Sequence, residues 1–223
     1  MIQYLDWDSS FFEKKIGKLT VDEDVDALDI ESINEGNFDI VYIFSRKPIC
    51  VEAALVDVKI TFIKAVDIFA ESINVVDFNP LKHSYEQLVN LAFVSGHESR
   101  FLKDPNFGID HFKKLYKKWV DNAISDENTI IKVYEENKSI MGFAICSLKR
   151  DENKIGLIAV DAGFQGRGIG SLLVKSIENA IEPGELLYVA TQESNTLACR
   201  FYENLGFAHY SKVNIYHYAK HSL

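Results

Sequence analysis

Residues 155–181 read IGLIAVDAGFQGRGIGSLLVKSIENAI and predict a strand, a glycine-rich turn and a helix in succession. The apolar run at residues 155–160 is typical of a buried strand. Three alternate glycines, Gly166, Gly168 and Gly170, follow it, and from Ser171 onward apolar residues recur at helical spacing. Such a turn leaves backbone N–H groups and the positive end of a helix free to face an anion. The stretch therefore predicts an anion-binding turn between a buried strand and a helix.

The spacing of the glycines decides which anion this turn fits. A dinucleotide fingerprint needs glycine where this chain has Ser171, and a nucleotide P-loop needs a lysine directly after its last glycine. The turn instead resembles the Gln/Arg-x-x-Gly-x-Gly/Ala loop of the GNAT acyl-CoA N-acyltransferases. That resemblance implies that the pyrophosphate of acetyl-CoA is held by Gln165, Gly166, Arg167, Gly168, Ile169 and Gly170. Taken alone, the turn is equally well interpreted as a glycine-rich surface turn.

A second motif lies at residues 194–207, SNTLACRFYENLGF. Asn195 and Tyr202 are seven residues apart, so on a helix they share one face. The segment resembles the second GNAT motif, Asn-x-x-Ala-x-x-x-Tyr-x-x-x-Gly-Phe, which is matched by Asn195, Ala198, Tyr202, Gly206 and Phe207. Two motifs in the family's order make the resemblance far more specific than either one alone.

The resemblance implies an α/β (α+β) GNAT fold, with a central mixed, mostly antiparallel sheet flanked by helices. In that family the strand before the loop splays from its neighbour, and its backbone pairs with the pantetheine arm and polarises the thioester. Those positions correspond here to Leu157, Ile158, Ala159 and Val160. Asn195 would contact the same arm, and the Tyr202 hydroxyl would protonate the leaving thiolate. The alternative for Tyr202 is a half-buried core phenol.

A narrower resemblance covers most of the chain and concerns the substrate. The opening WDSSFF with IGKL, the segment Ser99-Arg100-Phe101 and the run VATQ at 189–192 are similar to the dTDP-fucosamine acetyltransferases of cell-surface polysaccharide synthesis. This likeness implies a small N-terminal α/β domain at residues 1–74 and a GNAT domain at 75–223. Arg100 would bind the diphosphate of a sugar nucleotide, because a guanidinium can take two phosphate oxygens at once. The alternative is that Arg100 pairs with Glu98 or with a neighbouring carboxylate.

These patterns predict an acetyl-CoA-dependent N-acetyltransferase that transfers acetyl directly to the amine of a dTDP-linked amino-deoxy sugar. Two alternatives stay open. One keeps the fold but changes the acceptor to a protein N-terminus, a polyamine or an antibiotic amine. The other is an acyl-CoA-binding module without turnover. The sequence names no general base.

The composition of the chain limits the classes of molecule that we expect it to bind. The 223 residues carry a net charge of −9, which argues against broad binding to nucleic acid or anionic membranes, so a small-molecule substrate is expected. Three widely spaced cysteines and the lack of a long apolar stretch predict a soluble cytoplasmic protein. The oligomeric state stays open, a homodimer included. His217 and His221 have a metal-like spacing only on a helix, whereas residues 213–218 resemble a strand, so no metal is expected.

The remaining pattern predicts further elements in order. We expect strands at 16–21, 39–44, 56–63, 129–135, 139–148, 186–191 and 213–218. We expect helices at 85–93, from a capping Asp110 onward, and at 195–205, with a short helix at 51–55. The opening at 5–12 reads as aromatic and turn-forming, with Trp7 and Phe12 packed in the core.

Overall fold

The computed structural model describes residues 1–21, 27–28, 33, 37–70, 74–149 and 152–219. Its strands are β1 (Gln3–Tyr4), β2 (Ile16–Val21), β3 (Ile40–Ser45), β4 (Ala54–Ala65), β5 (Val75–Asp77), β6 (Thr129–Glu136), β7 (Ser139–Ser147), β8 (Asn153–Val160), β9 (Leu186–Gln192) and β10 (Ala208–Ala219). Its helices are α1 (Asp6–Phe12), α3 (Tyr85–Ser95), α4 (Arg100–Lys103), α5 (Gly108–Ser125), α6 (Ile169–Glu178) and α7 (Thr196–Asn204), with a 3-10 turn, η1, at Ala162–Phe164.

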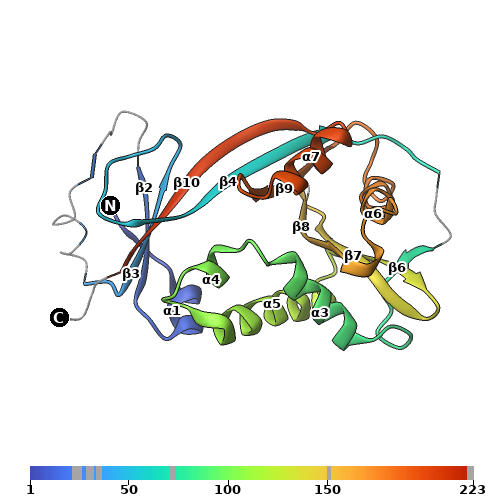
Figure 1. Ribbon diagram of the computed structural model, residues 1–223, viewed down its shortest axis with the longest axis horizontal. Coiled ribbons are helices and arrows are strands. Elements are labelled where there is room, and N and C mark those ends of the chain that lie inside the picture. The colour runs from blue at the N-terminus through green and yellow to red at the C-terminus, as the bar shows by residue number, and fades with distance from the viewer. Residues whose placement is uncertain (22–26, 29–32, 34–36, 71–73, 150–151, 220–223) are drawn as a thin grey trace.

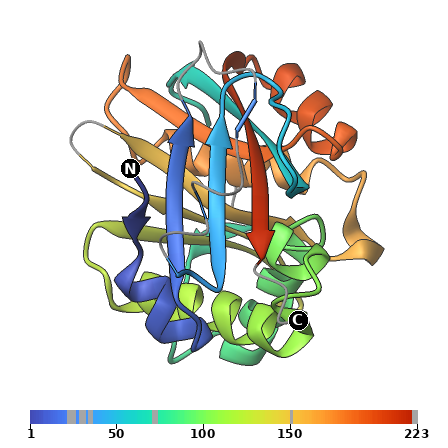
Figure 2. The same cartoon turned by 90° about the vertical axis from the view of Figure 1, so that its left-hand side faces the viewer.

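The strands form one mixed sheet in the order β1-β2-β3-β10-β4-β9-β8-β7-β6-β5. Among the described strands, β2–β3 and β8–β9 pair in parallel and every other neighbouring pair is antiparallel. Figure 2 shows β2 and β3 pointing the same way and β10 pointing against them. Helices α1, α3, α4 and α5 lie along the bottom of Figure 1, while α6 and α7 lie at its upper right. The expected mostly antiparallel sheet with flanking helices is confirmed.

The sheet runs without a break across residue 74, where we placed a domain boundary. The C-terminal strand β10 pairs with β3 on one side and with β4 on the other, so it ties the first third of the chain to the rest. Strand β4 in turn pairs with β9. The division into residues 1–74 and 75–223 stays a prediction, and the two parts share one sheet.

Strands β8 and β9 separate part-way along their length. Their parallel pairing covers only residues 153–155 of β8 and 187–189 of β9. Beyond that point β8 stays paired with β7 as far as Val160, and β9 stays paired with β4 as far as Gln192. A wedge therefore opens between two adjacent strands, and the backbone of β8 that faces it has no strand partner.

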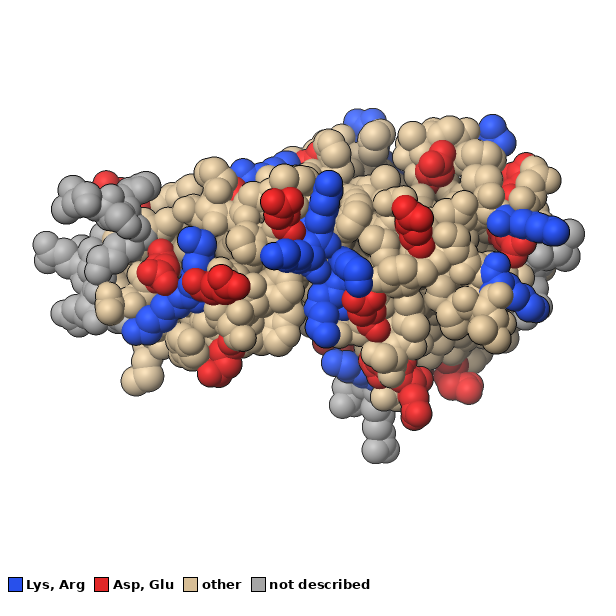
Figure 3. Space-filling view, turned by 90° about the horizontal axis from the view of Figure 1, so that it is seen from below, with Lys and Arg blue, Asp and Glu red and all other residues tan. Residues whose placement is uncertain are grey.

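The sequence of helix α5 explains why it forms a helix with one buried face. Its buried residues are Phe112, Leu115, Tyr116, Val120 and Ala123, which recur every three or four positions. The opposite side is exposed and carries Lys113, Lys114, Lys117 and Lys118, as expected for a solvated face. Figure 3 views the molecule from below, where both basic and acidic side chains are present.

Three local predictions were wrong. Residues 6–12 form helix α1 rather than a turn, because Asp6 and Asp8 favour its first turn and Glu13 ends it with a φ of 54°. Residues 51–55 form no helix, since β4 begins at Ala54 and gains two strand partners. Helix α5 begins at Gly108, so Asp110 lies inside its first turn instead of capping it.

His217 and Asp104 form a buried pair at the end of β10. Burial lowers the pKa of His217, so the imidazole is neutral and its Nδ1–H donates to the Asp104 carboxylate. Burial alone would raise the pKa of Asp104, but hydrogen bonds from His217 and Asn106 hold it below its usual value. His217 is thus a structural residue on a strand, and its suggested companion His221 lies outside the described residues.

We expect the protein to lose stability as the pH falls from about 7 to 5. Unfolded His217 takes a proton near its ordinary pKa of 6.5, whereas the folded residue takes one only at lower pH. The unfolded chain then binds more protons, which costs at most about 1.4 kcal/mol per pH unit for one group. Urea unfolding at pH 7, 6 and 5 measures this slope. In His217→Asn the slope should be smaller, and an unchanged slope would contradict the assignment.

Candidate active site

A cavity of about 1110 Å³ runs from the glycine-rich turn, through the β8–β9 wedge, to the far side of the sheet. Its first part is lined by residues from 164–166 and 168–171 together with Asn195, Ala198 and Tyr202. The wedge contributes residues 155–160 of β8 and 189–192 of β9. The far part is lined by Trp7, Asp8, Asp57, Arg100, Tyr116 and Trp119. One continuous space therefore joins both motifs to Arg100 and to residues, such as Asp57, that the sequence did not associate with them.

The turn at 165–170 has the backbone that an anion site needs. Gly166 and Gly168 adopt φ values of +76° and +78°, and an added Cβ at either would meet no atom within 4 Å. Glycine is therefore required there by conformation rather than by space. Helix α6 begins at Ile169, two residues before the expected Ser171, so its first N–H groups emerge directly from this turn.

Two side chains stabilise the same turn. Gln165 donates from Nε2 to the carbonyl of Val160, and Arg167 donates to the carbonyl of Gly163 while lying 4.6 Å from the Phe164 ring centroid. At Gly170 the constraint is close packing, because a Cβ would come within 3.1 Å of the Phe201 ring. Two side-chain hydrogen bonds thus hold the turn, and Gly170 packs it against α7.

Gly168→Ala is expected to weaken acetyl-CoA binding and to lower stability by about 1–2 kcal/mol, because alanine disfavours a positive φ. Gly184→Ala is the matched control, since Gly184 has a φ of +87°, equally open surroundings, and lies outside the residues that line the cavity. Both variants should unfold more easily in urea. Only Gly168→Ala should raise the acetyl-CoA Kd by calorimetry, and equal Kd values would contradict a coenzyme role for the turn.

The second motif forms helix α7 beside the wedge. The Asn195 side chain accepts a hydrogen bond from the Ala198 N–H and so caps the helix, while the residue also lines the cavity. Tyr202 is 3% exposed and packs against the rings of Phe62, Phe201 and Phe207. Burial raises the pKa of its phenol, and the nearby Cys199 adds to the effect. Tyr202 is therefore both a core phenol and part of the cavity wall.

Arg100 lies in the far part of the cavity, at the start of the short helix α4 rather than in a loop. Its guanidinium lies 4.9 Å from the ring centroid of Tyr42 and 4.7 Å from that of Phe101. Although the residue is partly exposed overall, its Nε atom is buried without a partner among the described residues. Burial lowers the pKa of this arginine, and the charges of Asp57 and Asp8 oppose that effect.

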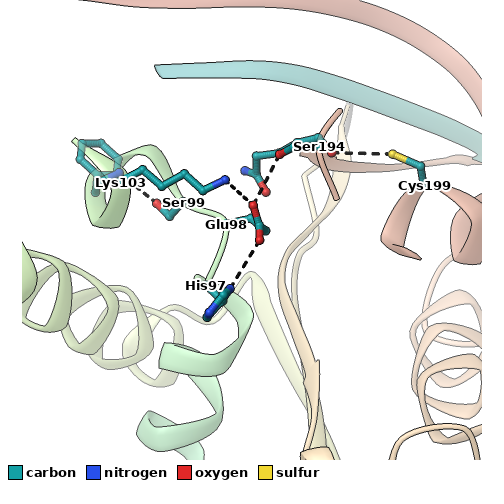
Figure 4. A network of polar contacts seen from close by, with 8 residues as sticks. His97, Glu98, Ser99, Lys103, Ser194 and Cys199 are labelled. Carbon is teal, nitrogen blue, oxygen red and sulfur yellow. Dashed lines mark hydrogen bonds and ion pairs between the residues drawn. The ribbon is translucent and has the colours of Figure 1, made fainter. Parts of the chain in front are cut away.

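The alternative pairing of Arg100 with Glu98 is absent from the described residues. Figure 4 shows that Glu98 instead contacts Lys103, His97 and Ser194. The distance from Glu98 to His97 Nδ1 is 3.5 Å. Arg100 is therefore not neutralised by Glu98.

Asp8 and Asp57 are the residues that the sequence interpretation missed. Burial raises the pKa of both carboxyls, and the charge of Arg100 works against that rise. The Oδ1 atom of Asp57 is buried and has no partner in the described part of the chain. One signal was available for Asp57, because Asp57 and Lys59 alternate in an otherwise apolar stretch that now proves to be a central strand. Trp7 was also misjudged, since it is 46% exposed and lines the cavity.

The part of the chain that the structure describes contains no group of three His, Cys, Asp or Glu side chains placed to hold a metal ion. None of the described helices combines the length and the apolar character that a bilayer-spanning segment needs.

Comparison with known proteins agrees with this geometry. The model of the acetyltransferase (GNAT) family matches residues 96–207. The "Spore coat polysaccharide biosynthesis protein SpsD" of Bacillus subtilis is 28% identical over 134 residues, which cover 59% of this chain and 46% of that protein. A "[Ribosomal protein bS18]-alanine N-acetyltransferase" of Haemophilus ducreyi is 33% identical over 76 residues, covering 33% and 52%. The chain thus spans about half the length of these curated relatives.

A solved structure shows the same fold at low sequence identity. The GCN5-related N-acetyltransferase of Sphaerobacter thermophilus superimposes with a TM-score of 0.53 and 14% identity, over 81% of this chain and 59% of that one.

Proposed function

The chain belongs to the GNAT acetyltransferase family, and from this premise we propose that it transfers acetyl from acetyl-CoA to the amine of a nucleotide-linked amino-deoxy sugar. The observation that carries the proposal is the single cavity that joins the glycine turn to Asp8, Asp57 and Arg100. A relative named for spore coat polysaccharide biosynthesis supports a sugar acceptor. The assignment of dTDP as the nucleotide rests on the sequence resemblance described above.

The residues present fit acetyl-CoA. The turn at Gln165–Gly170 offers glycine backbone and the N-terminus of α6 to a pyrophosphate. The unpaired edge of β8 offers the backbone of Leu157, Ile158, Ala159 and Val160 to an extended amide-containing arm. Asn195 lines the same space, and its Nδ2 group is free to contact that arm because Oδ1 holds the helix cap.

Acetyl-CoA would supply an activated acetyl thioester, and the chain's own residues would do the rest. Backbone N–H groups of β8 that face the wedge would orient and polarise the carbonyl. Tyr202 would donate its phenolic proton to the thiolate, and its raised pKa ensures that this proton is present at neutral pH.

A covalent acyl-cysteine route has little support. Burial raises the pKa of Cys146 to about 12, and burial also raises the pKa of Cys199. Both thiols are therefore protonated at neutral pH and weakly nucleophilic. Neither residue is among the described residues that line the cavity. Direct attack by the acceptor amine is the simpler route.

Arg100 would bind the acceptor, because it is a largely desolvated cation in the far part of the cavity. Its charge is already offset by Asp8 and Asp57, so it is a weaker site for a diphosphate than the sequence suggested. Carboxylate and guanidinium groups side by side suit the hydroxyl and ammonium groups of an amino sugar.

A second acceptor class is favoured by one observation. The bS18-alanine N-acetyltransferase of Haemophilus ducreyi is more identical to this chain, at 33%, than the Bacillus subtilis protein is, although over a shorter segment. A protein N-terminus is therefore the second candidate. A non-catalytic acyl-CoA-binding module is the third, and the placement of Tyr202 at the cavity argues against it.

The test is a thiol-release assay with acetyl-CoA and three acceptors. These are a dTDP-linked 4-amino-4,6-dideoxyhexose, the same sugar without the nucleotide, and a bS18 peptide that begins with alanine at its N-terminus. The proposal expects turnover that is highest with the nucleotide-linked sugar. Higher kcat/KM with the peptide would move the function to protein N-acetylation. Binding of acetyl-CoA without thiol release from any acceptor would support the non-catalytic module.

A further inference from the structure

Two lysines of the cavity wall take no part in the site as described so far. Lys59 lies on β4 and Lys154 on β8, and both line the cavity. Lys154 contacts Glu152 at 3.5 Å, whereas Lys59 forms no ion pair or hydrogen bond among the described residues. In a chain of net charge −9, a half-buried lysine without a carboxylate partner is unexpected.

Strand register places the two lysines on the same face of the sheet. Lys59 is paired with Gln192 of β9, and Lys154 is paired with Tyr188 of the same strand. Directly paired residues point to the same face, and residues four apart on one strand do so as well. Lys59 and Lys154 therefore emerge on one face, from the two sides of β9. Asp57 lies two residues before Lys59, so this is also the face of Asp57.

Lys59 lies among other charged side chains, two of them cationic and two of them carboxylates. Burial lowers the pKa of Lys59, and the charges of Lys154 and Arg100 lower it further. Asp57 and Glu152 oppose these effects but do not reverse them. Cations held near one another in a partly buried wall repel, so an anion bound between them would relieve that repulsion.

We propose that Lys59 and Lys154 form an acceptor-side anion subsite that binds the diphosphate of a nucleoside-diphosphate-linked acceptor. The inference rests on the proposed function, and it assigns the diphosphate to these two lysines rather than to Arg100. Arg100, with Asp8 and Asp57, is then left to face the sugar. The subsite is separate from the coenzyme turn, because Lys154 lies at the start of β8 and the turn follows its end at Val160.

The subsite can be tested by binding, independently of turnover. Calorimetry would follow dTDP, and separately inorganic pyrophosphate, titrated into protein that is saturated with coenzyme A so that the glycine turn is filled. We expect Lys59→Met and Lys154→Met each to raise the dTDP Kd by about tenfold or more, as for loss of a charge-assisted contact. Lys59→Arg should restore most of the affinity, and Lys113→Met on the exposed face of α5 is the control.

The outcomes separate the two proposals. If dTDP and pyrophosphate fail to bind the coenzyme-saturated protein, or bind equally well to Lys59→Met, the subsite is wrong whatever the enzyme acetylates. If Lys59→Met instead raises the Kd of coenzyme A, these lysines belong to the coenzyme site, which also overturns the inference. If dTDP binds in a Lys59-dependent way but no nucleotide-linked sugar is acetylated, the subsite stands and the proposed sugar acceptor fails.

Discussion

Tyr202→Phe is expected to bind acetyl-CoA like the wild-type protein and to turn over about 10²–10⁴ times more slowly, the range typical of a lost general acid. The change removes one hydroxyl and keeps the ring, which packs against Phe62, Phe201 and Phe207. Packing should therefore survive. The measurement is single-turnover acetyl transfer, so that product release does not hide the chemical step.

Tyr188→Phe is the matched control for this experiment. Tyr188 lies on strand β9 and also contacts an aromatic ring, that of Tyr210, edge to face, but it is not among the described residues that line the cavity. Its variant should turn over at the wild-type rate. If Tyr202→Phe also keeps that rate, Tyr202 is a packing residue and the proton must come from another group.

The pH profile offers a separate check on Tyr202. A general acid works only while protonated, so its contribution is lost as pH rises through its pKa. Burial raises the pKa of Tyr202 above the ordinary value of 10.0. We therefore expect no alkaline fall in kcat from this group below about pH 10. An alkaline fall near pH 8 that disappears in Tyr202→Phe would contradict the environment described here.

The proposed coenzyme half of the candidate site was predictable because its features are local. A positive φ at Gly166 and Gly168, the cap at Asn195 and the seven-residue spacing to Tyr202 each depend on a few consecutive residues. Features of this kind can be recognised from the sequence alone. The splayed strand was predicted only through the family resemblance, since its pairing depends on β7 and β9.

Of the proposed acceptor half only Arg100 was predicted, and through a resemblance, because this half is assembled across the whole chain. Asp8 comes from α1, Asp57 from β4 and Arg100 from α4, and only tertiary structure brings their charges together. Trp7 illustrates the same limit. Judged by residue type it belongs in a core, but α1 turns Phe12 inward and leaves Trp7 at the cavity. The strand expected at 56–63 was found, but its beginning at Ala54 was missed, because its partners β9 and β10 are far away in sequence.

Arg100→Met is expected to raise the acceptor KM by about 30-fold or more, in line with the loss of a buried, hydrogen-bonding charge. The KM for acetyl-CoA should not change, because Arg100 lies on the opposite side of the wedge from the glycine turn. Arg100→Lys keeps the charge but loses the planar fork and its stacking on Tyr42 and Phe101, so it should rescue only part of the loss.

Loss of stability is the competing explanation for an Arg100 defect, and a second variant separates the two. Without Arg100, the carboxyls of Asp8 and Asp57 lose the cation that holds their pKa values down, so burial would raise those values further. Arg100→Met combined with Asp57→Asn removes one of the two carboxylates, and it should recover most of the lost stability in urea unfolding. If Arg100 binds the acceptor, this double variant stays poor in acceptor KM. Recovery of KM together with stability would instead make Arg100 a structural residue, whose defect acts through the fold alone.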